Sequence, residues 1–386
     1  MKVILEAQWA CTETPRGIQS YTIQIISHLL KRNTYNYELT FFDGNHEKNN
    51  RQWIEKYFGE YDIPIHECNT LSYRETFHDK NVYKEKSYND YTGAKGDVFH
   101  FSNLISIPDN LSGKMVVTIH DVLQLRYPEY FHHETSEMFH LNIERLNKMQ
   151  PLIITVSESS KKDILYFSDI PEEEIYVIPE AHNVDNCFYN NDPDTLTKLG
   201  IDSPYLLFLS AIAKNKNLCR IVEAFESLAE RFPDIKLVVA GGSAVLTDFD
   251  TIEKIKNSIF VSRIIMTGYV SDEQKHILYS NALAFLFPSL CEGFGLPILE
   301  AMSCGCPVIT SNICSMPEVA GDAAILIDPC STEQLAYEME RVILSDSLRK
   351  ELKEKGLEHS KKFSWDKTAE MTEKVYKIAT DINGVC

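Results

Sequence analysis

The sequence predicts an α/β protein of two domains, each built on a doubly wound parallel sheet, with a cleft between them. A chain of 386 residues exceeds what one hydrophobic core usually supports. Short apolar, β-branched runs alternate with segments of helical periodicity, which is typical of a parallel sheet. This alternation occurs twice, on either side of a polar stretch at 189–203. Because ligands of such sheets lie beyond the carboxyl ends of the strands, functional residues are expected just after each strand.

In the first half, apolar runs that end in polar or glycine-containing turns predict four strands: Lys2–Leu5, Val98–Phe101, Met115–Ile119 and Leu152–Val156. Apolar residues at three- and four-residue spacing predict helices at Ile18–Leu30 and Glu158–Tyr166. Glu6 cuts the first apolar run short, which indicates a buried strand rather than a signal peptide. Segment Glu67–Gly96, rich in Tyr, Asp, Lys and Asn, is expected to be a solvated surface insertion; a mobile loop facing the cleft is the alternative.

In the second half the same rhythm predicts five strands: Tyr205–Leu209, Ile235–Ala240, Ile264–Thr267, Ala284–Phe287 and Pro307–Thr310. Helices are expected between or after them: Leu218–Glu230, Asp272–Asn281, Leu296–Met302 and Thr332–Leu344. A last helix is expected over 366–382.

The composition excludes several classes of protein. Lys+Arg 38 against Asp+Glu 56 gives a net charge of −18, which argues against nucleic-acid binding and allows at most peripheral membrane contact. No stretch approaches the roughly 18 apolar residues that span a bilayer. The ten cysteines form no Cys-x-x-Cys pair, so reduced thiols are expected rather than a metal or redox site. We therefore expect a cytoplasmic protein, peripheral at most at the inner face of the cell membrane.

The stretch Pro288–Asn312, PSLCEGFGLPILEAMSCGCPVITSN, is the most informative part of the sequence. A glycine-rich turn follows a predicted strand, and Pro297 then lies in the first turn of a helix, where a missing N–H costs little. The amides of Phe294, Gly295 and Leu296 are therefore expected to point out of a helix N-terminus. Such a terminus binds a phosphate or a sugar oxygen.

Two carboxylates border this turn, Glu292 in the loop and Glu300 in the helix. Carboxylates accept paired hydrogen bonds from vicinal diols, which ribose and hexoses share. The alternative is an ordinary strand–turn–helix with a surface glutamate at each end. The glycine turn between the two glutamates and the Cys-Gly-Cys-Pro-Val-Ile run after them favour a binding site.

On these residues the chain resembles the retaining glycosyltransferases of group 1, family 4 of the GT-B class, in which two Rossmann-like domains face each other. The signature is Glu, seven residues, Glu, and here it runs from Glu292 to Glu300. The resemblance covers nearly the whole chain and includes further segments: Arg16-Gly17-Ile18, Val116–Phe131, Thr155–Leu165, Lys214–Leu218, Thr267–Gln274, Pro317–Pro329 and Phe363-Ser364-Trp365. The resemblance is specific for the family, but it says little about which sugar is transferred.

The resemblance implies a domain plan and two catalytic residues. Residues 1–190 would form the acceptor-binding domain, 191–365 the nucleotide-sugar-binding domain, and 366–386 a helix that packs back on the first domain. Glu292 would hold hydroxyls of the donor sugar near the reacting centre. His120 would contact the donor sugar or its phosphate from across the cleft, which would close when the donor binds.

The resemblance also implies the donor-binding residues. Glu300 would accept hydrogen bonds from the ribose. Lys216 and the amides of Phe294–Leu296 would bind the diphosphate in place of a metal. Gly17, which has no side chain, would let the backbone approach the ligand. The remaining members of the donor set are Tyr269 and Val270 at the nucleobase, with Ser210 and Lys214. Alternatives stay open: Lys216 as a solvated lysine, His120-Asp121 as a helix cap, and Gly17 as a residue that only relaxes a turn.

Three departures from the family pattern lower the expected strength of donor binding and allow a catalytically weakened member. Asn215 stands where many relatives have an arginine. Lys214 could replace the positive charge, but it lacks the two parallel N–H donors of a guanidinium. Ser210 stands where a glycine is common. Glu180-Ala181 replaces the usual Asn-Gly.

The implied reaction is transfer of a hexose, mannose favoured, from a GDP- or UDP-sugar to a glycan or lipid-linked saccharide in polysaccharide biosynthesis. No metal or other cofactor is expected.

Asp192–Asp194 and Asp248–Asp250 match the Asp-x-Asp metal pattern of another transferase fold, but surface acids fit their polar surroundings better. The absence of Gly-x-Gly-x-x-Gly disfavours a dehydrogenase. The rivals are a sugar-nucleotide epimerase and a non-catalytic sugar-nucleotide-binding subunit.

Overall fold

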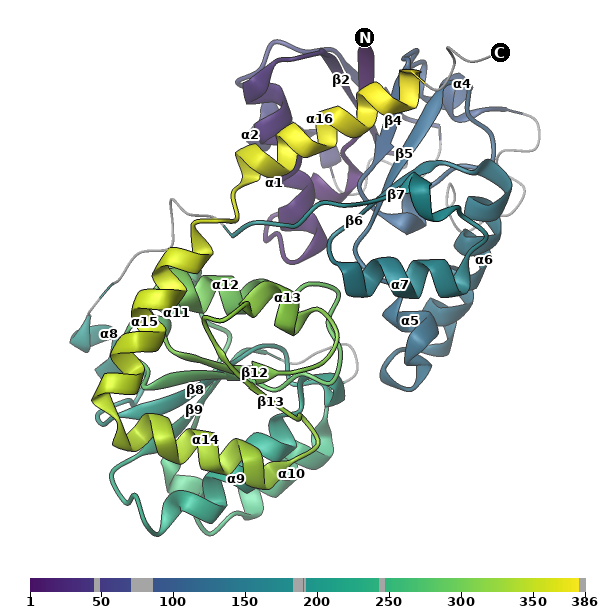
Figure 1. Cartoon of the computed structure of the whole chain (residues 1–386). Helices are drawn as coiled ribbons and strands as arrows, with labels where there is room; N and C mark the ends of the chain where they lie inside the picture. The colour runs from purple at the N-terminus through teal and green to yellow at the C-terminus, as the bar shows by residue number, and fades with distance from the viewer. Residues whose placement is uncertain (45–48, 71–85, 183–189, 191, 243–246, 382–386) are drawn as a thin grey trace. The chain divides into compact units, whose positions relative to one another are not determined.

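The structure, a computed structural model, describes all residues except 45–48, 71–85, 183–189, 191, 243–246 and 382–386. The chain forms two compact units (Figure 1). Unit 1 consists of Met1–Pro128, His133–Glu180 and Trp365–Cys386, and unit 2 of Glu129–His132 and Ala181–Ser364. No helix in the described part of the chain is long and apolar enough to cross a bilayer.

Unit 1 contains a seven-stranded parallel sheet of order β3-β2-β1-β4-β5-β6-β7. Its strands are β1 (Lys2–Glu6), β2 (Asn36–Phe42), β3 (Ile65–Cys68), β4 (Val98–Phe101), β5 (Lys114–Ile119), β6 (Leu152–Thr155) and β7 (Ile175–Val177). Its helices are α1 (Ile18–Arg32), α2 (Asn50–Phe58), α4 (Tyr88–Thr92), α5 (Leu123–Arg126), α6 (His133–Met149), α7 (Glu158–Phe167) and α16 (Trp365–Asp381). The strand order reverses between β1 and β4, which is therefore the switch point of this sheet.

Unit 2 contains a six-stranded parallel sheet of order β10-β9-β8-β11-β12-β13. Its strands are β8 (Tyr205–Leu209), β9 (Lys236–Ala240), β10 (Ile264–Gly268), β11 (Ala284–Phe287), β12 (Val308–Ser311) and β13 (Ile325–Ile327). Its helices are α8 (Pro193–Lys198), α9 (Leu218–Ala229), α10 (Phe249–Asn257), α11 (Asp272–Asn281), α12 (Leu296–Ser303), α13 (Met316–Ala320), α14 (Thr332–Leu344) and α15 (Asp346–Ser360). The switch point lies between β8 and β11. The two doubly wound parallel sheets confirm the predicted fold class.

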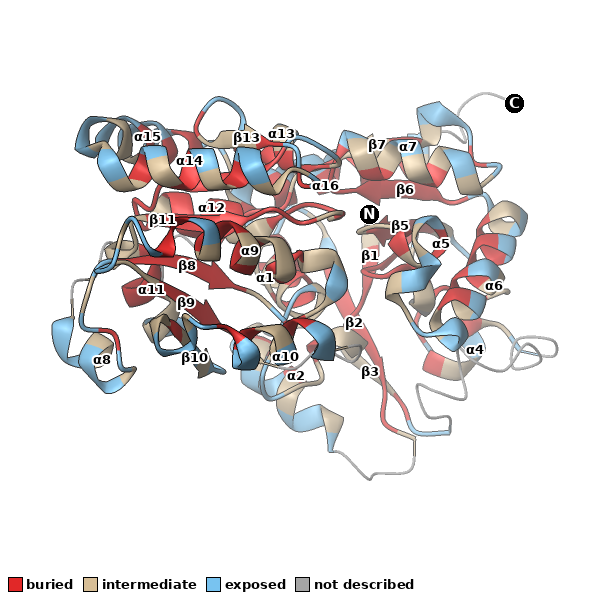
Figure 2. Ribbon diagram, turned by 90° about the horizontal axis from the view of Figure 1, so that it is seen from below, coloured by how far each residue is buried: buried red, intermediate tan, exposed pale blue. Residues whose placement is uncertain are grey.

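The strands of both sheets form the buried centre of their unit (Figure 2). Every residue of β4 (VFHF) and of β8 (YLLFL) is buried, including the histidine of β4. Helices cover both faces of a parallel sheet, so its strands are continuous apolar runs rather than alternating ones. The strands and helices expected from the sequence are all present, with ends shifted by at most two residues.

Strand β2 was not expected, because Glu38 interrupts its apolar run. The carboxylate of Glu38 is almost buried, but it lies 2.6 Å from Lys2 Nζ on β1 and 2.7 Å from His66 Nε2 on β3. Burial alone would raise the pKa of Glu38, yet the hydrogen bonds from Lys2 and His66 lower it below its usual value. The charge is thus compensated across strands, and β2 can occupy the interior of the sheet.

The expectation of a solvated insertion at Glu67–Gly96 is wrong for its last part. Residues 71–85 lie outside the described ones, but α4 packs into the core. Tyr88 is fully buried, with its ring edge-on to the rings of Phe99 and Phe101 on β4. Its hydroxyl lies 2.8 Å from Thr40 Oγ1, so the polar end of the side chain is satisfied.

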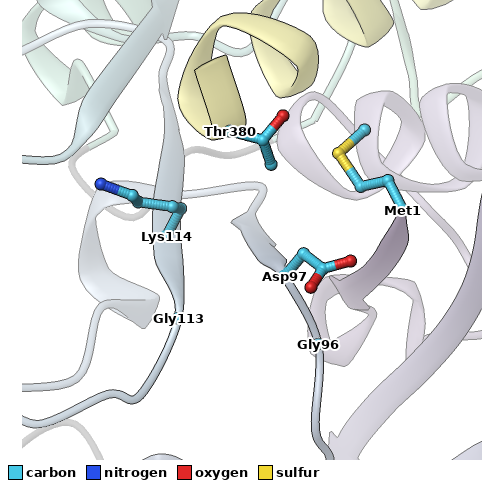
Figure 3. Close-up of a pocket in the computed structure, with 6 residues that line it drawn as sticks. All are labelled: Met1, Gly96, Asp97, Gly113, Lys114 and Thr380. Carbon is cyan, nitrogen blue, oxygen red and sulfur yellow. The ribbon is translucent and has the colours of Figure 1, made fainter. Parts of the chain in front are cut away.

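A hollow of about 660 Å³ lies at the amino ends of the strands of unit 1, lined by Met1, Gly96, Asp97, Gly113, Lys114 and Thr380 (Figure 3). Asp97 is already engaged there, since its Oδ2 accepts the N–H of Lys2 at 2.8 Å. This is the sheet edge opposite to the carboxyl ends, where ligands of parallel sheets bind. The hollow is therefore no candidate for the predicted site.

Helix α16 packs along α1 within unit 1 (Figure 1). The carboxylate of Glu373 on α16 is buried, with Oε2 3.0 Å from Arg32 Nε and Oε1 2.9 Å from the hydroxyl of Tyr37. One carboxylate thus joins three elements, α16, α1 and β2. Such a charge-assisted contact is a strong anchor because both partners lose their hydrogen bonds when it is removed.

We predict that Glu373→Ala lowers the free energy of unfolding by about 2–3 kcal/mol, because the hydroxyl of Tyr37 and the guanidinium of Arg32 lose a charged acceptor. Urea unfolding followed by circular dichroism measures the change. Glu370→Ala is the matched control, since Glu370 pairs with Lys374 at the exposed surface of the same helix and its removal should leave the midpoint unchanged. Equal midpoints for the two variants would contradict the anchoring role.

Candidate active site

Several of the predicted residues follow the carboxyl ends of strands, in the loops after β8 and β11 of unit 2 and after β1 and β5 of unit 1. In unit 2, Ser210 directly follows β8, and Glu292 lies in the loop after β11. In unit 1, His120 directly follows β5, and Gly17 ends the loop after β1. These are the positions at which doubly wound sheets bind ligands.

The structure brings Lys216 and Glu292 together. Lys216 ends a short 3₁₀ helix, η6 (Lys214–Lys216), and its Nζ lies 2.6 Å from Glu292 Oε1. The two side chains are only 19% and 13% exposed, and the ammonium also lies over the ring of Phe287, 5.7 Å from its centroid. A half-buried, paired lysine does not fit the alternative of a solvated one. The pair places a cation and a carboxylate together at the switch point of unit 2.

Asn217 fixes the loop that carries Lys216. Its backbone is left-handed, with φ of 61°, and its side-chain amide donates to the carbonyls of Pro288 at 2.9 Å and Pro329 at 2.8 Å. The N–H of Leu290 donates in turn to the carbonyl of Asn215 at 2.8 Å. The loop after β8 is therefore hydrogen-bonded to the loop after β11, and Lys216 is held against Glu292.

The turn before α12 is shaped by Gly295 and Ser315. Gly295 has φ of 112°, a conformation that side chains disfavour, and it caps the helix that begins at Leu296. The Oγ of Ser315 lies 3.0 Å from the carbonyl oxygen of Glu292 and 2.7 Å from that of Phe294, which holds the turn from behind. The side chain of Phe294 is buried, so the turn offers backbone amides at the helix N-terminus.

Glu300 lies on α12 with two neighbours from α11 that the sequence reasoning missed. Lys275 Nζ lies 3.6 Å from Glu300 Oε1, and the hydroxyl of Tyr279 lies 3.4 Å from Oε2. The carboxylate remains 26% exposed and can accept further hydrogen bonds. Lys275 directly follows the segment Thr267–Gln274, so its place at the start of a helix was the available signal.

The other predicted donor-binding residues differ in how far their side chains are exposed. Tyr269 is 64% exposed, whereas Val270 is buried, so only the first offers a side chain. Lys214 pairs at 3.6 Å with Asp250 on α10, and both are largely exposed. Ser210 continues the sheet, since its N–H donates to the carbonyl of Ala240 at 3.1 Å.

The two Asp-x-Asp segments begin helices. Asp192 caps α8 by accepting the N–H groups of Asp194 and Thr195, and Asp248 caps α10 by accepting the N–H of Thr251 at 3.2 Å. Their carboxylates are thereby engaged in local hydrogen bonds. Across the described residues, no group of three or more His, Cys, Asp or Glu is arranged to hold a metal ion.

In unit 1, His120 is held by a carboxylate that follows β7. Its Nδ1 lies 2.7 Å from Glu180 Oε1, its Nε2 lies 3.2 Å from the carbonyl oxygen of Ser102, and its side chain is 10% exposed. Burial alone would lower the pKa of His120, but the hydrogen bond and the charge of Glu180 raise it above its usual value. The next helix, α5, has Val122 rather than His120 or Asp121 as its N-cap residue, although Asp121 Oδ1 accepts the N–H of Leu123 at 3.1 Å.

Gly17 caps α1 with φ of 49° and ψ of −118°, a conformation that requires glycine. Its carbonyl accepts the N–H of Tyr21 at 3.0 Å. Among the described residues, no heavy atom lies within 4 Å of the position that a Cβ would take. The geometry therefore fits both a close approach to a ligand and a relaxed turn.

Comparison with known proteins decides the family. The description "Glycosyl transferases group 1" matches residues 194–359, which include the whole site of unit 2. The O-antigen chain mannosyltransferase B of Escherichia coli is 30% identical over 302 residues, 76% of this chain and 76% of that protein. The chain belongs to the glycosyl transferases group 1 family. It is a glycosyltransferase.

Two further comparisons bear on this glycosyltransferase. The serotype-specific mannosyltransferase WbdA of Escherichia coli is 29% identical over 278 residues, which is 70% of this chain and 34% of WbdA. The chain thus spans about a third of WbdA. Among solved structures, the sucrose-phosphate synthase of Thermosynechococcus elongatus has a TM-score of 0.74 at 18% identity and covers 97% of this chain and 98% of its own. This structural similarity shows a shared GT-B fold.

We predict that Asn217→Gly lowers the free energy of unfolding by about 1–3 kcal/mol, because glycine keeps the left-handed backbone but removes both hydrogen bonds to the buried carbonyls. Asn217→Asp should destabilise further, since it turns a carboxylate towards two carbonyl oxygens. Urea unfolding of both variants measures the effect. Asn33→Gly is the control, because Asn33 also has a positive φ, at the exposed end of α1. If Asn217→Gly proves as stable as Asn33→Gly, the link between the loops is dispensable.

Proposed function

We propose that this glycosyltransferase moves a hexose, mannose favoured, from a GDP- or UDP-sugar to a glycan or lipid-linked saccharide, with retention of anomeric configuration and without a metal ion. The observation that carries the proposal is the 2.6 Å contact between Lys216 and Glu292 beside the N-terminus of α12. The contact holds a cation next to the loop that leads into α12, and a cation and helix-end amides are the groups that stabilise a leaving diphosphate.

In this proposal each group of unit 2 has a separate task. Lys216 and the amides of the turn at 294–296 stabilise the departing nucleotide diphosphate as the anomeric carbon–oxygen bond breaks through an oxocarbenium-like state. Glu292 contacts Lys216 through Oε1, and its second oxygen accepts hydrogen bonds from hydroxyls of the sugar. Glu300 accepts the ribose diol, with Lys275 and Tyr279 holding its carboxylate.

The sugar and the acceptor are proposed from the relatives. Mannosyltransferase B is named for an O-antigen chain and WbdA for a serotype, and both are mannosyltransferases by name. The solved structure of Anabaena Alr3699/HepE, with a TM-score of 0.71 at 18% identity and coverage of 98% of this chain and 99% of its own, contains UDP and glucose. The two mannosyltransferases support a bacterial surface polysaccharide as the product, and the HepE complex supports a nucleotide-sugar donor. We propose at most peripheral membrane contact.

Nucleotide binding tests the donor site. Calorimetric titration with GDP, UDP and dTDP in EDTA should show binding of one nucleotide, and Glu300→Ala should weaken it by about tenfold or more because the ribose loses charged acceptors. Glu351→Ala, on the exposed face of α15, is the control and should bind as the wild type does. Binding that appears only with a divalent ion would refute the metal-free site.

Turnover tests the role of Lys216. With the nucleotide sugar found to be a donor, Lys216→Met should lower kcat/KM by about 100-fold, the usual effect of removing one group that stabilises transition-state charge. Lys355→Met is the matched control, since Lys355 pairs with Glu351 at the exposed surface of α15. Product analysis with and without a saccharide acceptor separates transfer from epimerisation. Normal turnover by the Lys216→Met enzyme would contradict the proposed mechanism.

A further inference from the structure

The two ring nitrogens of His120 face a backbone carbonyl, which only accepts hydrogen bonds, and the carboxylate of Glu180, which only accepts them when ionised. Nδ1 lies 2.7 Å from the carboxylate of Glu180, and Nε2 lies 3.2 Å from the backbone carbonyl of Ser102. A neutral imidazole has one N–H and one lone pair, so one of its nitrogens would place a lone pair against an acceptor. Only the doubly protonated ring can donate to both.

A second histidine of the same sheet shows the opposite arrangement. His100 on β4 has Nδ1 2.6 Å from the hydroxyl of Tyr376 and Nε2 2.8 Å from that of Thr118. Hydroxyls both donate and accept, so they satisfy a neutral ring. Burial, together with the nearby charge of His120, lowers the pKa of His100 to about 3. One buried histidine is thus built to be neutral and its neighbour to be charged.

We propose that Glu180 is a positioning residue that holds His120 as an imidazolium at the carboxyl edge of the first sheet, where its Nε2–H is a charged donor for a substrate oxygen. The role of His120 towards a substrate rests on the proposed function, whereas its charge state does not. The contact of Nε2 with Ser102 is the longer of the two, so Nε2–H is the group that a substrate oxygen would take over. An imidazolium donates and stabilises negative charge, and it does not act as a base.

The groups around the ring favour this charge. Glu180 is buried, and Asp121, the next residue, acts on His120 in the same direction. From α1, Tyr21 lies edge-on with its ring centroid 4.5 Å away, and burial raises its pKa, so it stays neutral. From β4, His100 is neutral, as described above. Glu180 thus supplies the opposing charge in direct contact with the ring, and its removal should change the charge of His120.

The charge state can be measured directly. Nitrogen-15 NMR distinguishes an imidazolium from either neutral tautomer, and the signals of His120, one of twelve histidines, are assigned by their loss in His120→Gln. At pH about 7.5 the wild type should show both ring nitrogens protonated, whereas Glu180→Gln should show a neutral ring. A neutral His120 in the wild type overturns the proposal without any need for a folded variant. A charged His120 in Glu180→Gln overturns the role of Glu180.

The same pair makes stability depend on pH. The pKa of folded His120 lies above its usual value of 6.5, so the stabilisation is full below that value and is lost as pH rises through the folded pKa. Glu180→Gln should therefore lower the melting temperature more at pH about 6 than at pH about 9. Asp366→Asn is the control, because Asp366 pairs at 2.8 Å with His28 but is 63% exposed. An equal loss at both pH values would count against a charged pair.

Turnover separates a positioning role from a merely structural one. In the wild type kcat/KM should fall as pH rises through the raised pKa of His120, and in Glu180→Gln this fall should move to lower pH, while Asp366→Asn keeps the wild-type profile. An unchanged profile in Glu180→Gln would overturn the substrate-facing role. If the wild type transfers no sugar at all, the proposed function fails, whereas the NMR result still decides the charge state.

Discussion

One buried amide, that of Asn217, holds the site of unit 2 together. The sheet places β8 beside β11, but it does not by itself fix the loops that leave these strands. The side chain of Asn217 joins them by donating to the carbonyls of Pro288 and Pro329, and its left-handed backbone turns the chain from η6 into α9. Lys216, the preceding residue, is thereby aimed at Glu292. This link and the 2.6 Å contact of Lys216 Nζ with Glu292 Oε1 together fix the geometry of the pair.

Opposite charges within one unit hold the predicted residues in place. Lys216 is held by Glu292, and His120 by Glu180, each at hydrogen-bonding distance and each largely removed from water. Breaking such a pair leaves an uncompensated buried charge, so both partners stay ordered without a ligand. Lys216 is therefore oriented in the absence of a ligand, and the loss of its side-chain entropy has already occurred on folding.

The sequence predicted the parts of the fold that rest on local pattern, and it missed those that rest on distant partners. The run Tyr205–Leu209 is apolar throughout and was predicted to the residue, whereas β2 was missed because Glu38 is neutralised by residues of two other strands. In the site, the glycine turn before α12 was visible as a motif. The contacts of Lys275 with Glu300 and of Glu180 with His120 were not, because they join residues far apart in the chain.

Two residues that depart from the family pattern, Asn215 and Glu180, each make a defined contact in the structure. At position 215 the backbone carbonyl accepts the N–H of Leu290, so this contact of the loop does not depend on the side chain. At position 180 a glutamate adds a charge, and that charge is matched by His120 at 2.7 Å. The contact of Glu180 with His120 lies within unit 1 and that of Asn215 with Leu290 within unit 2, so each departure is accommodated by its own unit.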